Sequence, residues 1–120
     1  MAKNRAKTFG KALREKRIER GYSLRKFAEL VGVSPTYLSQ VEQANVDPPT
    51  ADRVKRMAEL LSENPDEWIA LAGRVPDDLE AIIHEEPTEF PDLLRAASGL
   101  TAEQLRKLQE AAKRFKREDK

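Results

Sequence analysis

The stretch that decides the fold is SLRKFAELVGVSPTYLSQVE, residues 23–42. Apolar residues recur in it at helical spacing on both sides of Gly32. Ser23 is a good N-cap for the helix before Gly32, and the glycine supplies the positive φ that a tight turn needs. Ser34 caps a second helix with Pro35 at its first position, where the missing N–H costs nothing. The stretch therefore predicts two short helices joined by a glycine turn.

The apolar and small residues of this stretch lie where two crossing helices need them. Ala28 is small enough to let the two backbones approach. Leu38 and Val41 lie three apart on the inner face of the second helix, and Phe27 and Val31 face them. This spacing favours a helix-turn-helix over an ordinary helical hairpin with a polar surface, which is the alternative.

The outward positions of the second helix are polar. The amide of Gln40 offers a paired donor and acceptor, which can bind adenine N6 and N7 in the major groove of DNA. The outward residues are Pro35, Thr36, Ser39, Gln40 and Gln43.

Further helices are predicted on both sides of this stretch, and no segment alternates with the period of a strand. Thr50 and Asn64 are predicted N-caps, and Thr101 with Gln104 predicts a capping box. The fold class is therefore all-α. The predicted helices are 8–20, 24–31, one from 35, one from 51, one from 65 to 73, one from 76, 91–97 and one after 101.

The quoted stretch resembles the Cro/CI-type (Xre family) helix-turn-helix of phage repressors and bacterial regulators. The resemblance covers roughly residues 8–73, and the Asp-Glu-Trp-Ile segment is similar to the fifth helix of that family. It implies a five-helix lambda-repressor-like DNA-binding domain with a basic N-terminal arm over residues 1–74. A C-terminal helical extension over 75–120 follows, as a dimerisation or partner-binding segment.

The resemblance also implies roles for individual residues, with the second helix of the pair lying in the major groove. Base readout is expected from Ser34, Pro35, Thr36, Tyr37, Ser39 and Gln40. Phosphate contacts are expected from Ser23, Arg25, Lys26, Gln43 and Asn45. Lys3, Arg5 and Lys7 of the arm are candidate groove contacts, and a solvated disordered tail is the alternative. A structural ion pair between Arg17 and Glu42 is expected to tie the first helix to the recognition helix.

Two positions depart from the family pattern. The family often has glutamine where this chain has Leu24, which we expect to pack rather than to touch phosphate. The loop after the recognition helix is often basic, but here it contains Asp47 followed by two prolines. Phosphate contacts therefore have to come from elsewhere, and Lys55 is a further candidate.

Charge divides the chain into two halves. Residues 1–62 carry 13 Lys/Arg and 7 Asp/Glu, whereas residues 63–120 carry 9 Lys/Arg and 14 Asp/Glu. The basic half suits a polyanionic partner such as double-stranded DNA. The acidic stretch 77–92 has seven carboxylates and no Lys or Arg. We interpret it as a solubilising surface, and contact with a basic partner or a neighbouring subunit is the alternative.

Other classes of function find little support. The chain has no cysteine, and His84 is its one histidine, so disulfides and thiol catalysis are excluded and neither a metal site nor a cofactor is expected. No glycine-rich phosphate loop or paired nucleophile and base indicates an enzyme. The longest apolar stretch is too short to span a bilayer, and no secretory signal is evident. We therefore expect a cytoplasmic, nucleoid-associated protein encoded by a bacterium or a phage.

The last predicted helix carries a narrow apolar stripe made of Leu105, Leu108, Ala112 and Phe115. The stripe either packs back on earlier apolar residues (Ile82, Ile83, Phe90 and Leu93) or pairs with a second chain. A homodimer is favoured because one recognition helix reads too few bases for useful specificity.

The sequence thus favours a dimeric repressor of a near-palindromic operator whose half-sites lie about one helical turn apart. Two alternatives stay open. One is the antitoxin of a toxin–antitoxin pair that represses its own operon. The other is a protein-interaction module built on a helix-turn-helix scaffold, with a protein partner at the C-terminal extension.

Overall fold

The computed structural model describes residues 2–118, with side chains from residue 4 onward, and these residues form helices and loops without a β-strand. The all-α fold class is confirmed. In chain order the helices are α1 (Ala2–Glu19), α2 (Leu24–Val31), α3 (Pro35–Glu42), α4 (Ala51–Leu60), α5 (Pro65–Leu71), α6 (Asp77–Glu85), α7 (Glu89–Ala97) and α8 (Ala102–Glu118).

The chain divides into two compact units, one up to Glu80 and one from Ala81 onward. The division lies within α6, whereas the boundary predicted after Arg74 lies in the segment between α5 and α6. We call these parts the N-terminal unit and the C-terminal unit, and each is described by itself.

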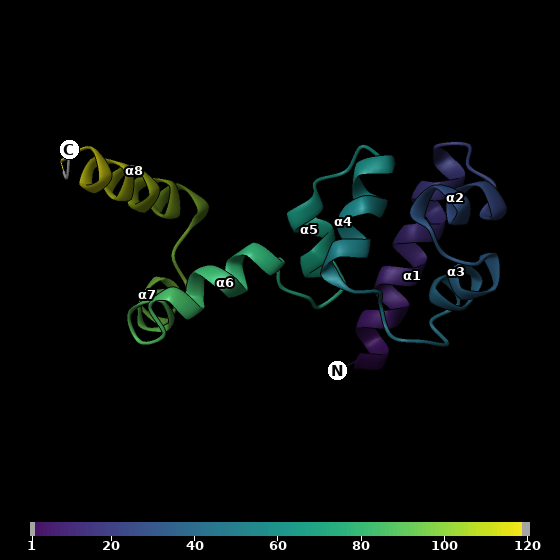
Figure 1. Ribbon diagram of the computed structural model, residues 1–120, viewed down its shortest axis with the longest axis horizontal. Helices are drawn as coiled ribbons and strands as arrows, with labels where there is room; N and C mark the ends of the chain where they lie inside the picture. The colour runs from purple at the N-terminus through teal and green to yellow at the C-terminus, as the bar shows by residue number, and fades with distance from the viewer. Residues whose placement is uncertain (1, 119–120) are drawn as a thin grey trace. The chain divides into compact units, whose positions relative to one another are not determined.

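The N-terminal unit is a five-helix assembly around one apolar core. α1 contacts both α3 and α5, α2 packs on α3 and α4, and α4 packs on α5 (Figure 1). Phe9 meets Trp68 edge to face, with ring centroids 5.8 Å apart. Each large side chain that is fully buried contributes about 1.5–3 kcal/mol to folding. These side chains are Phe9, Leu13, Phe27, Leu38, Val41, Val54, Met57 and Leu61.

The first helix begins six residues earlier than the sequence predicts. The segment expected to form a basic arm is therefore helical, because Ala6 continues the apolar spacing of Phe9 and is itself buried. Arg5 and Lys7 lie on the exposed side of these first turns. The side chain of Lys3 lies outside the described residues.

Gly10 sets the distance between α1 and α3. A Cβ atom at this position would lie 2.5 Å from the carbonyl oxygen of Val41 and 2.8 Å from that of Glu42. The backbones of the two helices therefore meet directly, and only glycine fits. This close approach fixes α3 against the first helix.

The predicted N-cap position of α4 is confirmed at Thr50, although its side chain makes no cap hydrogen bond. The predicted start of α7 is wrong. α7 begins at Glu89 rather than at Pro91. Pro91 is tolerated because it is the third residue of the helix, where an N–H has no partner within the helix.

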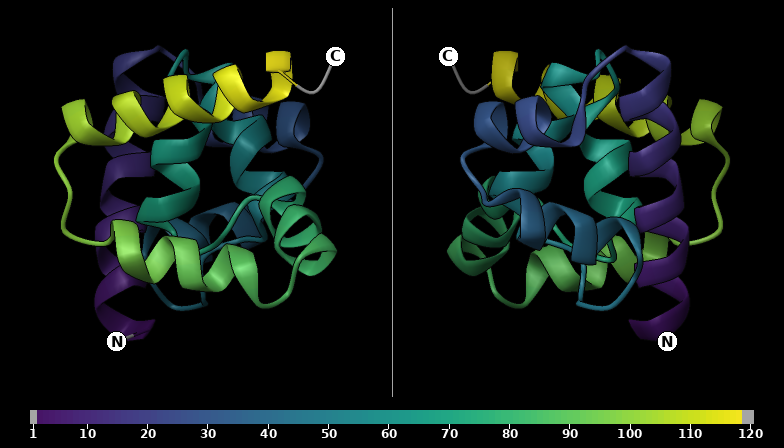
Figure 2. Two further views of the ribbon diagram at one scale, coloured as in Figure 1. Left: turned by 90° about the vertical axis from the view of Figure 1, so that its left-hand side faces the viewer. Right: turned by 90° about the vertical axis from the view of Figure 1, so that its right-hand side faces the viewer.

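The C-terminal unit consists of the end of α6 with α7 and α8, and none of its described side chains is buried. The predicted capping box is confirmed at the start of α8. Gln104 N donates to Thr101 Oγ1 at 3.1 Å, and Thr101 N donates to Gln104 Oε1 at 3.0 Å. α8 is one continuous helix (Figure 2). Its apolar side chains remain at the surface.

Candidate nucleic-acid interface

Local side-chain bonds position α2 and α3. Ser23 Oγ accepts from the backbone N–H of Lys26 at 3.0 Å, and Ser34 Oγ accepts from that of Tyr37 at 3.1 Å. Gly32 has φ 86° and caps α2. Both helices therefore have defined starts and a defined turn between them, and the predicted bounds of α2 are confirmed.

α3 has one apolar and one polar face. Leu38 and Val41 are buried on the inner face. Pro35 and Thr36 are exposed, whereas Ser39, Gln40 and Tyr37 are partly exposed. The amide of Gln40 makes no hydrogen bond among the described side chains, so its donor and acceptor are available to a ligand.

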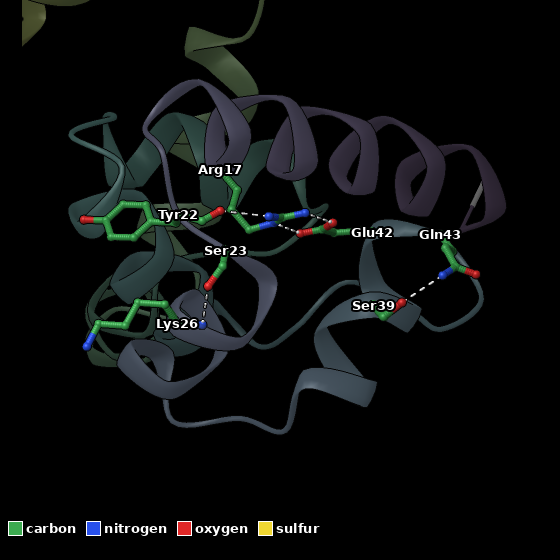
Figure 3. A network of polar contacts seen from close by, with 7 residues as sticks. All are labelled: Arg17, Tyr22, Ser23, Lys26, Ser39, Glu42 and Gln43. Atoms are coloured by element: carbon green, nitrogen blue, oxygen red, sulfur yellow. Dashed lines mark hydrogen bonds and ion pairs between the residues drawn. The ribbon is translucent and has the colours of Figure 1, made fainter.

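The far end of α3 carries a short chain of hydrogen bonds. Gln43 Nε2 donates to Ser39 Oγ at 2.8 Å (Figure 3), and Asn45 Nδ2 donates to Gln43 Oε1 at 3.3 Å. Ala44 has φ 61°, which turns the chain and lets Asn45 N donate to the carbonyl of Gln40. The structure thus brings one predicted base contact and two predicted phosphate contacts together.

A buried ion pair anchors α3 to α1. Arg17 Nε lies 2.7 Å from Glu42 Oε2, and Arg17 Nη2 lies 3.0 Å from Glu42 Oε1. Arg17 Nη1 also donates to the carbonyl of Tyr22 at 2.9 Å (Figure 3). The two side chains are only 11% and 4% exposed. The bidentate geometry fixes α3 both to α1 and to the turn before α2.

The first turns of α2 and α3 contain no acidic residue, whereas α4 to α8 each carry at least one there. Arg25 and Lys26 are exposed at the start of α2, beside the capping Ser23. The helix dipole and these cations make the start of α2 positive. This end of the helix can therefore attract an anion.

The remaining predicted contacts lie elsewhere in the N-terminal unit. Arg5 lies over Gly73 and shares a shallow hollow with Asp47 and Pro48 of the loop that follows α3. Lys55 is exposed on α4. These residues are not part of the α2–α3 surface described above.

Two arginines that the sequence analysis did not single out make contacts across the unit. Arg74 donates from Nη2 to the carbonyl of Pro48 at 2.6 Å and from Nε to that of Pro49 at 3.1 Å. Arg53 places Cζ 5.9 Å from the ring centroid of Tyr37. Both contacts join residues distant in the sequence, so no local pattern could have indicated them.

Lys16 links α1 to the loop between α4 and α5. Its Nζ lies 3.0 Å from Glu63 Oε1 and 3.3 Å from Glu19 Oε2. The hydrogen bond to Glu63 and then that to Glu19 raise the pKa of Lys16 above its usual value.

The predicted stripe of α8 lines an open apolar groove within the C-terminal unit. Leu105 and Leu108 are exposed, and Phe115 is 67% exposed. The groove has a volume of about 520 Å³. Its lining comes from α7 and α8: Leu93, Leu94, Ala97, Leu105, Leu108, Gln109, Ala111, Ala112 and Phe115.

The capped helix pair, the glycine turn and the anchored polar helix define a helix-turn-helix protein. Residues 13–68 match the helix-turn-helix family HTH_3, which is of the Xre or Cro/CI type. Among curated protein sequences, none is significantly similar to the chain.

Solved structures include proteins with a similar fold. An HTH_3 family transcriptional regulator from Vibrio cholerae is 27% identical with a TM-score of 0.51, over 58% of this chain. The match spans only 39% of that regulator's length. The clp gene regulator ClgR from Corynebacterium glutamicum is 21% identical with a TM-score of 0.51, over 78% of this chain and 94% of its own. These similarities support the five-helix fold of the N-terminal unit.

Proposed function

We propose that this protein is a sequence-specific DNA-binding transcriptional regulator that acts as a dimeric repressor on a near-palindromic operator. The observation that carries the proposal is the polar outer face of α3, presented by a helix-turn-helix of the HTH_3 family. The description of the similar Vibrio cholerae protein as a transcriptional regulator supports it.

α3 is suited to enter the major groove as a rigid element. Thr36 and Gln40 lie one turn apart on its polar side, and Gln40 is free to bind a base edge. The pair between Arg17 and Glu42 holds α3 before any ligand arrives. DNA binding therefore costs little ordering of the recognition helix.

Phosphate binding is assigned to the positive start of α2 and the far end of α3. Arg25 and Lys26 are exposed cations next to the backbone N–H groups of the first turn. Gln43 and Asn45 present amides beyond α3. Contacts of this kind fix the register of α3 on the duplex without reading sequence.

Dimerisation is assigned to the apolar groove of the C-terminal unit, with a second copy of this chain as its occupant. Exposed Leu93, Leu94 and Phe115 need cover, because apolar surface left in water is unfavourable. Charge favours a second copy: α8 carries six Lys/Arg and three Glu, whereas the stretch 77–92 is purely acidic. Each chain thus offers both signs of charge to its partner.

Two substitutions test the DNA contacts. Gln40→Ala should relax the preference at one base position, at a cost of roughly 1–3 kcal/mol on the preferred site. Arg25→Ala should weaken binding to all sequences about equally and make the salt dependence shallower. Titrations of both variants against preferred and scrambled duplexes at several salt concentrations measure this. If Gln40→Ala weakened binding to every sequence equally, the assignment of α3 as the recognition helix would be wrong.

Sedimentation equilibrium tests the dimer. Leu108→Asp places a charge in the groove and should yield monomers, whereas Lys11→Asp, on the exposed surface of α1 in the N-terminal unit, should leave the dimer intact. The monomeric variant should also bind the full operator more weakly. A wild-type chain that sediments as a monomer at micromolar concentration, or a Leu108→Asp dimer, would show that the groove has another role.

A further inference from the structure

Arg53 and Tyr37 connect the first turns of two helices that are distant in sequence. Each is the third residue of its helix, Arg53 in α4 and Tyr37 in α3. The guanidinium carbon lies 5.9 Å from the centroid of the tyrosine ring, within the range of a cation–π contact. Tyr37 is partly buried against the core, so its ring is held in place and can support the exposed side chain of Arg53.

The charge of Arg53 is not neutralised by an ion pair. Among the described residues, no carboxylate oxygen lies within 4.0 Å of its guanidinium nitrogens. The described side chains make no hydrogen bond to Arg53, so its N–H donors remain available while the guanidinium contacts the Tyr37 ring. Arg53 can therefore rest on the ring and bind an anion at the same time.

We propose that Arg53 is a phosphate-contacting residue of the DNA interface and that Tyr37 holds it in position. The ligand is a backbone phosphate of the duplex beside the first turn of α3. This inference rests on the proposed function. Two positions that often contact phosphate in the family do not do so here. Leu24 packs against the core, and Asp47 is negatively charged. Arg53 supplies a cation to the same interface.

A phosphate is a better ligand for Arg53 than a base edge. The side chain comes from α4 and reaches α3 at its partly buried flank, through Tyr37, whereas the outward face of α3 carries Thr36 and Gln40. Phosphates line the edges of the groove that receives a recognition helix, and base edges lie at its floor. Arg53 therefore contributes affinity at every sequence and selects no base.

The test is Arg53→Gln in the full chain, titrated with the preferred duplex between about 50 and 200 mM salt. Loss of one phosphate contact in each half-site, two per dimer, should lower affinity by roughly 60-fold near 0.1 M salt and reduce the slope of log K against log salt by about 1.8. The ranking of base sequences should not change. Arg95→Gln in α7 removes the same charge from the C-terminal unit, outside α8 and the groove lining, and should alter neither quantity.

A double-mutant cycle tests the part played by Tyr37. Arg53→Gln should lower the DNA affinity less in a Tyr37→Leu background, because the tyrosine ring no longer holds the arginine side chain in position. Thermal melting of each variant verifies that it is folded. If the wild type prefers one sequence but Arg53→Gln keeps its affinity and slope, the inference is wrong and the proposed function stands. If the wild type prefers no sequence, both are wrong.

Discussion

The two units of this protein contain similar amphipathic helices but differ in what covers their apolar faces. In the N-terminal unit the helices enclose a core in which Phe9, Phe27 and Leu38 have no exposed surface. In the C-terminal unit no described side chain is buried. A few short helices cannot enclose a core by themselves, because the apolar face of each helix has to be buried against another layer of secondary structure. The first unit encloses its own core, whereas the second leaves its apolar side chains exposed.

The largest expected effect separates two phenylalanines. Phe9→Ala should destabilise the N-terminal unit by about 3–5 kcal/mol, since it empties a fully enclosed site. Phe115→Ala, at a position 67% exposed, should leave that unit's stability unchanged and weaken dimerisation instead. Urea denaturation followed by the fluorescence of Trp68, together with sedimentation, measures both. Equal losses of stability would remove the distinction between the units.

The ion pair between α1 and α3 should give the next effect. Glu42→Ala leaves the guanidinium of Arg17 without its partner in a largely buried position, and we expect a loss of about 3 kcal/mol in the free energy of unfolding. Glu29→Ala, on the exposed side of α2, serves as the matched control and should cost below about 0.5 kcal/mol. Denaturant titration decides, and a Glu42→Ala loss no larger than the control's would contradict the anchoring role.

Gly10→Ala should be destabilising although alanine is the better helix former. The added methyl carbon would meet the carbonyl oxygens of Val41 and Glu42, and separating α1 from α3 should cost about 1–3 kcal/mol. Lys11→Ala, next to it on the exposed surface, should be nearly neutral. A stabilised Gly10→Ala variant would show that the two helices do not meet backbone to backbone.

The smallest expected effect concerns Lys16. Its pKa is raised by Glu63 and Glu19, so its contribution to stability is present at neutral pH and is lost as the pH rises through the folded-state pKa. Lys16→Gln should therefore be slightly less stable than the wild type near pH 7. The difference should begin to shrink above about pH 10.5 and disappear once the pH exceeds the raised folded-state pKa. Thermal melting across alkaline pH provides the comparison. A difference that grew with pH would have the wrong sign.

Local signals were enough to predict α2, α3 and the capping box of α8. Ser23, Gly32 and Ser34 act on residues three or four positions away, so their effect is visible in the sequence. The start of α1 was missed because its basic residues resemble a tail, and burial of Ala6 overrides that appearance. Pro91 looked like a helix breaker but lies in a first turn.

Contacts across the fold could not be predicted from local pattern. The arginines at positions 53 and 74 meet a ring and two carbonyls brought near only by tertiary packing. The contact of Gly10 with α3 is of the same kind, although a glycine inside a helical pattern is a signal of close approach. The pair between Arg17 and Glu42 was expected from the family resemblance, and its spacing of 25 residues gives no local clue.

The proposed dimer would hold two recognition helices at a fixed spacing. Selection of the full chain's bound sequences from random duplex DNA tests this most directly. The proposed function predicts an inverted repeat whose two half-sites have centres about one helical turn apart, roughly 10–10.5 base pairs. A set of bound sequences with no common motif would contradict DNA reading by α3, and a single half-site without symmetry would contradict the dimer.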